Sequence, residues 1–208
     1  MADIVFYTNP RSRGQIVRWM LEELGEPYET VLLDYGTSMK SPEYLAINPM
    51  GKVPAITHRG VVVTEGAAIC AYLADAFPEK GLAPPPQDPQ RAPYYRWMFF
   101  AAGPVEAAVT AKALGLLAPP ERSMTVGYGS FDDTIGALES AVSGRDHICG
   151  DRFTAADVYV GAQIAWGLQF NAIPERPAFR DYASRIQARP AYQRAQQLDR
   201  AAAEKAEA

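Results

Sequence analysis

The spacing of apolar residues changes twice early in the chain. A compact apolar run at 3–7 is rich in strand formers, and a similar run follows at 28–34. Between them, from 11 to 25, apolar residues recur every three or four positions, which is the spacing of one helix face. The helical run closes on Gly25, a typical residue just beyond a helix end. This order of strand, helix and strand predicts a right-handed parallel crossover.

The next segment predicts a hairpin followed by a second helix. Residues 41–47 form at most one short helix. Apolar runs at 53–57 and 60–64 are separated by two residues, which predicts an antiparallel hairpin. At 65–77 the apolar residues return to the spacing of one helix face. This part of the chain therefore predicts the order βαβ followed by ββα.

After the second helix the pattern changes character. Residues 83–90 carry four prolines in eight positions, which is typical of a linker. Residues 91–117 predict a long helix that is interrupted at Gly103–Pro104, where a kink is expected. Further helices are predicted at 120–142, 154–170, 177–188 and 190–204. We therefore predict an α/β domain over 1–82, the linker, and an all-helical domain over 91–208.

Composition and charge narrow the class of protein. The net charge is −4, so neither nucleic acid nor an anionic membrane surface is an expected partner. No apolar run approaches the roughly 18 residues that a membrane-spanning helix needs. The two cysteines, 70 and 149, follow a start without signal-peptide character, which predicts reduced thiols in the cytoplasm. With His58 and His147 they show no metal-ligand spacing, and we expect no metal site.

Four local patterns together resemble the cytosolic glutathione transferases. They are "FYTNPRSRGQIVRW", "NPMGKVPAI", "VVVTEGAAICAYLAD" and "GDRFTAADVYVG". Their order and spacing carry the resemblance over essentially the whole chain. It implies a thioredoxin-like N-terminal domain that binds glutathione and an all-α C-terminal domain. A non-catalytic binding or regulatory module of the same fold is the alternative.

The second pattern resembles the part of the family's site that holds the backbone of glutathione. The resemblance implies a cis bond before Pro54, which turns the Val53 backbone outward to pair with the cysteinyl unit of glutathione like an added strand. From the nine residues alone, an ordinary turn is the simpler interpretation. Lys52 and Lys40 are candidates for the glycine carboxylate, although Lys40 also suits a solvated surface position.

The third pattern places Glu65 and Gly66 between a strand and a helix. Free N–H groups at a helix start can hold a carboxylate, and the resemblance implies the γ-glutamyl end of glutathione. Gly66 keeps the backbone amide but lacks the hydroxyl that the family usually has there. Glu65 also fits the ordinary preference of acids for first turns.

The first pattern bears on catalysis. The thiolate is the reactive form of glutathione, and a hydroxyl near the start of a helix can stabilise it. Ser12 is the expected catalytic residue, with Arg13, Tyr7, Thr8 and Asn9 as alternatives. Ser12 also fits a plain helix cap. The absence of cysteine in this loop argues against the cysteine-type members of the family.

The resemblance implies glutathione as co-substrate, no metal, and attack on a small apolar electrophile. Peroxide reduction, dehalogenation and isomerisation stay open. A two-fold dimer is expected through the helix at 65–77 and the first half of 91–117. The latter carries more aromatic surface, from Tyr94 to Phe100, than one core face can bury.

Overall fold

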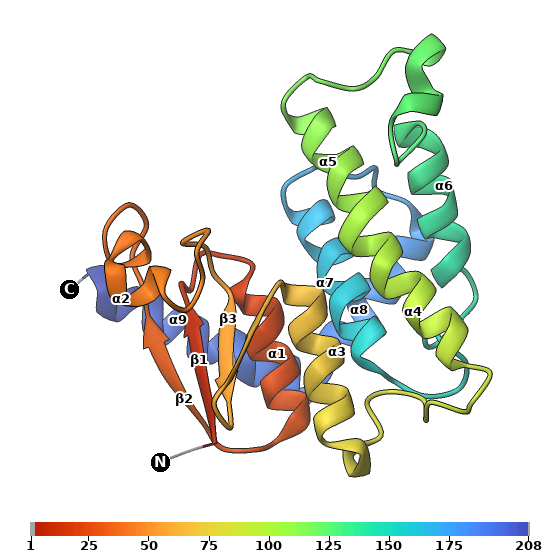
Figure 1. Cartoon of the computed structure of the whole chain (residues 1–208). Coiled ribbons are helices and arrows are strands. Elements are labelled where there is room, and N and C mark those ends of the chain that lie inside the picture. The colour runs from red at the N-terminus through yellow and green to blue at the C-terminus, as the bar shows by residue number, and fades with distance from the viewer. Residues whose placement is uncertain (1–2, 208) are drawn as a thin grey trace. The chain divides into compact units, whose positions relative to one another are not determined.

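The computed structural model describes residues 3–207 and divides into two compact units (Figure 1). One unit holds the residues up to Gly81 together with those from Ala188 onward, and the other is Leu82–Gln187. The elements of the first unit are β1 (Ile4–Thr8), α1 (Gly14–Leu24), β2 (Tyr28–Leu32), the 3-10 turn η1 (Ser38–Lys40), α2 (Pro42–Leu45), β3 (Ala55–His58), β4 (Val61–Thr64), α3 (Gly66–Ala76), the 3-10 turn η2 (Pro78–Lys80) and α9 (Pro190–Glu207).

The first unit is built on a four-stranded sheet in the order β2-β1-β3-β4. β1 runs parallel to β2 and antiparallel to β3, and β3 pairs antiparallel with β4. Phe6 of β1 lies opposite Ile56 of β3, and both side chains are fully buried. α1 contacts α3 and β1, so the helix between the first two strands packs back onto the sheet. The predicted order βαβ followed by ββα is confirmed.

The strand register brings four loops to one end of this sheet. Thr8, the last residue of β1, lies opposite Leu32, the last residue of β2. Ala55, the first residue of β3, lies between Tyr7 of β1 and Thr64, the last residue of β4. The chain segments that follow β1, β2 and β4 and the segment that precedes β3 therefore all begin at the same edge.

The last helix, α9, packs against α1 of the first unit. Arg18 and Asp199 form an ion pair at 2.6 Å, and each side chain is only 4% exposed. Arg189 donates two hydrogen bonds to the Glu23 carboxylate, at 2.6 and 2.7 Å. The sequence pattern predicts this segment as part of the helical domain, because a local pattern does not reveal which partner a helix will contact. The proposed domain limits themselves stay a prediction.

The second unit is helical. Its elements are α4 (Arg91–Phe100), the π-helical turn η3 (Ala101–Val105), α5 (Glu106–Ala113), the 3-10 turn η4 (Pro120–Thr125), α6 (Phe131–Val142), α7 (Ala155–Gln169) and α8 (Pro177–Gln187). The interruption expected at Gly103–Pro104 is the π-helical turn, since proline lacks the N–H that would continue an α-helical ladder. The helical stretch predicted at 120–142 is helical only in part. Pro120 opens only a 3-10 turn, and α6 starts afresh after Ser130, whose hydroxyl accepts from the Asp133 amide at 3.0 Å.

The central helix of the second unit, α7, is buried along most of its length. Thr154 and Asp157 form the capping arrangement that ties down its first turn: the Asp157 carboxylate accepts the Thr154 amide at 2.9 Å. Asp157 also accepts the Tyr182 hydroxyl at 2.6 Å. Within residues 3–207, no helix combines the length and the apolar character that crossing a bilayer requires.

Candidate functional site

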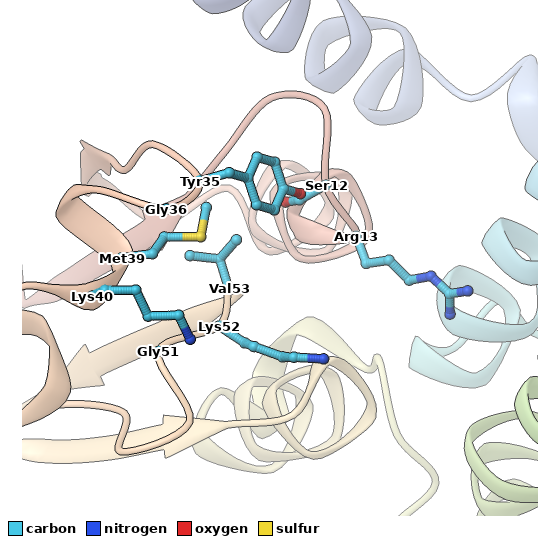
Figure 2. Close-up of a pocket in the computed structure, with 9 residues that line it drawn as sticks. All are labelled: Ser12, Arg13, Tyr35, Gly36, Met39, Lys40, Gly51, Lys52 and Val53. Atoms are coloured by element: carbon cyan, nitrogen blue, oxygen red, sulfur yellow. The ribbon is translucent and has the colours of Figure 1, made fainter.

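A pocket of about 340 Å³ lies in the first unit where the loops at the sheet end meet (Figure 2). Three segments line it: the turn before α1, the loop after β2, and the loop before β3. The lining residues are Ser12, Arg13, Tyr35, Gly36, Met39, Lys40, Gly51, Lys52 and Val53. The pocket therefore brings together four of the seven predicted site residues, namely Ser12, Lys40, Lys52 and Val53.

Two hydrogen bonds to the Lys52 carbonyl hold the loop before β3 in place. The Val53–Pro54 bond is cis, as the resemblance implied. The Lys52 carbonyl accepts the Tyr44 hydroxyl at 2.6 Å and the Asn48 side-chain amide at 2.8 Å. Burial raises the pKa of Tyr44 to about 12, so this hydroxyl stays a donor at neutral pH. Within residues 3–207, the Val53 backbone has no hydrogen-bond partner, and Val53 lines the pocket.

Two lysines stand beside this loop. The Lys40 ammonium donates to the Met50 carbonyl at 2.8 Å, which leaves it two further hydrogens for a ligand. Gly51 adopts a φ of +58°, and a side chain there would collide with the Met39 carbonyl at 2.5 Å. Lys52 is exposed at the pocket edge. Both lysines can therefore reach an anionic group at this end of the pocket.

Ser12 lies in the turn before α1 and is only 6% exposed. Its hydroxyl donates to the Asn9 carbonyl at 2.7 Å and accepts the Gly14 amide at 2.9 Å. The hydroxyl thus closes the turn and accepts the amide of the first residue of α1, but the helix cap itself is Arg13, so the plain capping interpretation of Ser12 is off by one residue. Ser12 also lines the pocket, so the serine that holds the first amide of α1 is the same residue as the candidate for catalysis.

Asn9 connects this turn to the loop after β2. Its side-chain amide donates to the Leu33 carbonyl at 2.9 Å, and its side-chain oxygen accepts the Arg11 amide at 3.0 Å. Tyr7 instead packs against a core cluster that includes Leu33, with its ring 5.7 Å from that of Tyr44. Neither Asn9, Tyr7 nor the buried Thr8 lines the pocket, and among the sequence-predicted alternatives to Ser12 only Arg13 does.

Glu65 and Gly66 lie at the same sheet end but outside the residues that line the pocket. Thr64 pairs with Ala55, so Glu65 follows directly beside the start of β3 and the cis proline. Glu65 adopts φ +66° and ψ +116°, a backbone conformation that residues other than glycine rarely occupy. Its carboxylate caps no amide of α3 and is exposed. Gly66 is the first residue of α3.

Comparison with known proteins identifies the family. Residues 12–76 match the family model described as the glutathione S-transferase N-terminal domain. The chain is 30% identical to glutathione S-transferase GstA of Escherichia coli O157:H7 over 151 residues, which cover 70% of this chain and 73% of that protein. The chain belongs to the glutathione S-transferase family. Its fold prediction, a thioredoxin-like domain followed by a helical domain, is thereby confirmed.

Solved structures of other glutathione S-transferases extend the similarity to nearly the whole transferase. A glutathione transferase from Methylococcus capsulatus is 30% identical, with a TM-score of 0.77 over 94% of this chain and 98% of that chain. A sphingomonad glutathione S-transferase, crystallised with glutathione, is 28% identical with a TM-score of 0.76 and the same coverage.

Sequence reasoning missed several residues of the site. Tyr44 and Asn48 hold the cis-proline loop, and Tyr35 and Met39 line the pocket. Asn48 opens the "NPMGKVPAI" pattern, so its position in the motif was a usable signal. Tyr35 belongs to no motif, and only the fold reveals its place. Within the described part of the chain, no cluster of three or more histidine, cysteine or acidic side chains is arranged to hold a metal ion.

Proposed function

We propose that this transferase binds glutathione in the pocket at the sheet end and activates it as the thiolate, whose sulfur attacks a small apolar electrophile and joins it to glutathione as a thioether. The observation that carries the proposal is the convergence of three loops on the unpaired Val53 backbone, with Ser12 in the same pocket. A tripeptide has backbone groups that need partners, and an outward-facing strand edge supplies them. The many relatives named glutathione S-transferases favour the catalytic function over a non-catalytic binding module.

The remaining predicted residues fit the cysteinyl backbone and the two charged ends of glutathione. Val53 would pair with the cysteinyl backbone in front of Pro54, and Lys40 and Lys52 would meet the glycine carboxylate. Glu65 and Gly66 would receive the γ-glutamyl end, where the α3 amides favour a carboxylate and the Glu65 carboxylate favours the ammonium group.

Ser12 is the proposed catalytic residue. The thiol of bound glutathione releases its proton to solvent, and the thiolate attacks an electrophilic carbon. A carbon–sulfur bond forms while the leaving group departs with its electron pair. We propose that the first turn of α1 and the Ser12 hydroxyl stabilise this thiolate, for which the hydroxyl gives up its bond to the Asn9 carbonyl. The place of Ser12 in the pocket lining supports this role.

Ser12→Ala tests this role. Turnover with a panel of electrophiles should fall about tenfold or more, because one hydrogen bond to a charged group contributes roughly 1.5–3 kcal/mol. Retention on immobilised glutathione should persist. Ser140→Ala, at an exposed position of α6, is the matched control, since within residues 3–207 its hydroxyl bonds only the Ala137 carbonyl of its own helix. Wild-type protein that is retained but turns over no electrophile, peroxide or isomerisable substrate would favour the binding module instead.

We also propose a cytoplasmic homodimer. Two aromatic side chains of α4 support the dimer: Tyr95 is 42% exposed and Phe99 is 71% exposed, and their rings are 6.3 Å apart. Their neighbours Tyr94, Trp97 and Met98 are buried in the helical unit, so this ring pair is the aromatic surface that the core leaves uncovered. Cys70 and Cys149 are free and buried, which suits a reducing compartment.

A further inference from the structure

Tyr35 stands at the mouth of the pocket with its hydroxyl unused. It is 61% exposed, and within residues 3–207 the side chain makes no hydrogen bond. Figure 2 shows the ring reaching from its loop toward the Ser12 side of the pocket. An exposed tyrosine is common on protein surfaces, and exposure alone would carry no functional meaning. What distinguishes Tyr35 is its place in a lining where only one other residue, Ser12, carries a hydroxyl.

The loop that carries Tyr35 is fixed on both sides. The Leu33 amide donates to the Thr8 carbonyl at 2.9 Å, and the Asp34 amide donates to the Ser38 hydroxyl at 2.7 Å. Gly36 follows with a φ of +74°, which turns the chain sharply just after the tyrosine. The backbone of Tyr35 is therefore anchored next to the strand that leads to Ser12, and its side chain lines the pocket.

The pocket offers few donors to a sulfur anion. Of the nine lining residues only Ser12 and Tyr35 carry a hydroxyl. The single proton of Ser12 is directed to the Asn9 carbonyl in a short bond of 2.7 Å. In Figure 2 Lys40 and Lys52 lie on the opposite side of Val53 from Tyr35, and the Arg13 side chain points away from Val53. Tyr35 is thus the hydroxyl that can donate without giving up a bond it already makes.

We propose that Tyr35 is a second catalytic residue, whose hydroxyl donates a hydrogen bond to the thiolate of bound glutathione. This rests on the proposed function. Tyr35 keeps its own proton throughout, and the thiol proton passes to solvent as the thiolate forms. A thiolate can accept more than one hydrogen bond, so Ser12 and Tyr35 act together, with Ser12 also shaping the turn that starts α1.

The test is the ionisation of glutathione on the enzyme. The ultraviolet absorbance of the thiolate is titrated against pH in saturating glutathione, for wild type, Tyr35→Phe, Ser12→Ala and Tyr7→Phe. Tyr35→Phe should raise the pKa of the bound thiol by about one unit or more, and kcat/KM at neutral pH should fall by about tenfold. At high pH the rate should recover, because the thiolate then forms without help. Affinity for S-methylglutathione, which has no thiol to ionise, should not change.

Tyr7→Phe is the matched control, because its hydroxyl belongs to a side chain packed against the core cluster rather than lining the pocket. It should leave the pKa of the bound thiol unchanged. A bound-thiol pKa in Tyr35→Phe equal to that of wild type would overturn the proposal, as would a loss of S-methylglutathione affinity. If wild type lowers the thiol pKa and Tyr35→Phe keeps that lowering, only Tyr35 loses its role. If wild type binds no glutathione, the proposed function falls with it.

Discussion

Glu65 holds a backbone conformation that glycine would adopt at lower cost. At φ +66° and ψ +116° a residue with a Cβ is strained by about 1–3 kcal/mol. Glycine removes that strain but gains conformational freedom in the unfolded chain, which costs about 0.4–1 kcal/mol. The Glu65 side chain makes no capping bond to α3 that a substitution would break. Glu65→Gly should therefore be more stable than Glu65→Ala by about 1 kcal/mol.

Both substitutions should weaken glutathione binding, because both remove the carboxylate that we place beside the γ-glutamyl ammonium group. A hydrogen bond between charged groups contributes about 1.5–3 kcal/mol, and the exposure of Glu65 puts the loss at the lower end, about tenfold in Kd. Urea unfolding followed by circular dichroism gives the stability difference, and titration calorimetry with glutathione gives the affinity. Glu65→Gln, which keeps the shape and the strain but not the charge, separates the two effects.

The stability difference and the affinity loss are tested independently of each other. A glycine variant no more stable than the alanine variant would show that the conformation at residue 65 costs nothing, and the strain argument would be wrong. An alanine variant that binds glutathione as tightly as wild type would remove Glu65 from the site. A stability gain combined with an affinity loss is the signature of a residue whose backbone is held in an unfavourable conformation for the sake of its ligand.

Two further predictions concern packing and assembly. Asp199→Ala should lower the free energy of unfolding by about 3 kcal/mol, because it leaves the buried Arg18 guanidinium without its carboxylate. Arg194→Ala, which breaks a pair whose arginine is 52% exposed, should lower it by less than about 1 kcal/mol. Urea unfolding measures both values, and equal losses in the two variants would contradict this prediction. Phe99→Glu should disrupt the proposed dimer, so that sedimentation velocity finds a species near 22.7 kDa where wild type sediments at twice that mass; a wild type already at 22.7 kDa would exclude the dimer.

Local pattern predicted much of the fold because each early element carries its own signal. The helix at 11–25 and the hairpin strands follow from apolar spacing, and the structure places α1, β3 and β4 within a few residues of them. The docking of α9 on α1 was not predictable in this way. The buried ion pair between these helices joins Arg18 to Asp199, which lie 181 positions apart, so no local stretch of sequence contains both residues.

The residues of the candidate site also differ in whether local sequence predicts their position. Val53, Lys52 and Ser12 belong to recognisable motifs, so their place in the pocket was expected. The Ser12 hydroxyl bonds the Asn9 carbonyl and the Gly14 amide because the turn before α1 brings these groups together. The spacing of residues in the sequence did not predict these partners. Tyr35 enters the pocket only because β2 ends beside β1, a consequence of sheet register rather than of any motif.

The attachment of α9 to the first unit also sets an order for making the protein. The helical unit, Leu82–Gln187, is one uninterrupted stretch of chain, whereas the unit that carries the pocket lacks its closing helix until the residues after Ala188 have been made. During synthesis on the ribosome, Arg18 and Trp19 of α1 lack their contacts with α9 until more than a hundred intervening residues have been made. The unit whose synthesis begins first is therefore the unit that is completed last, and a nascent chain halted before α9 would hold a complete helical unit and a first unit that still lacks its last helix.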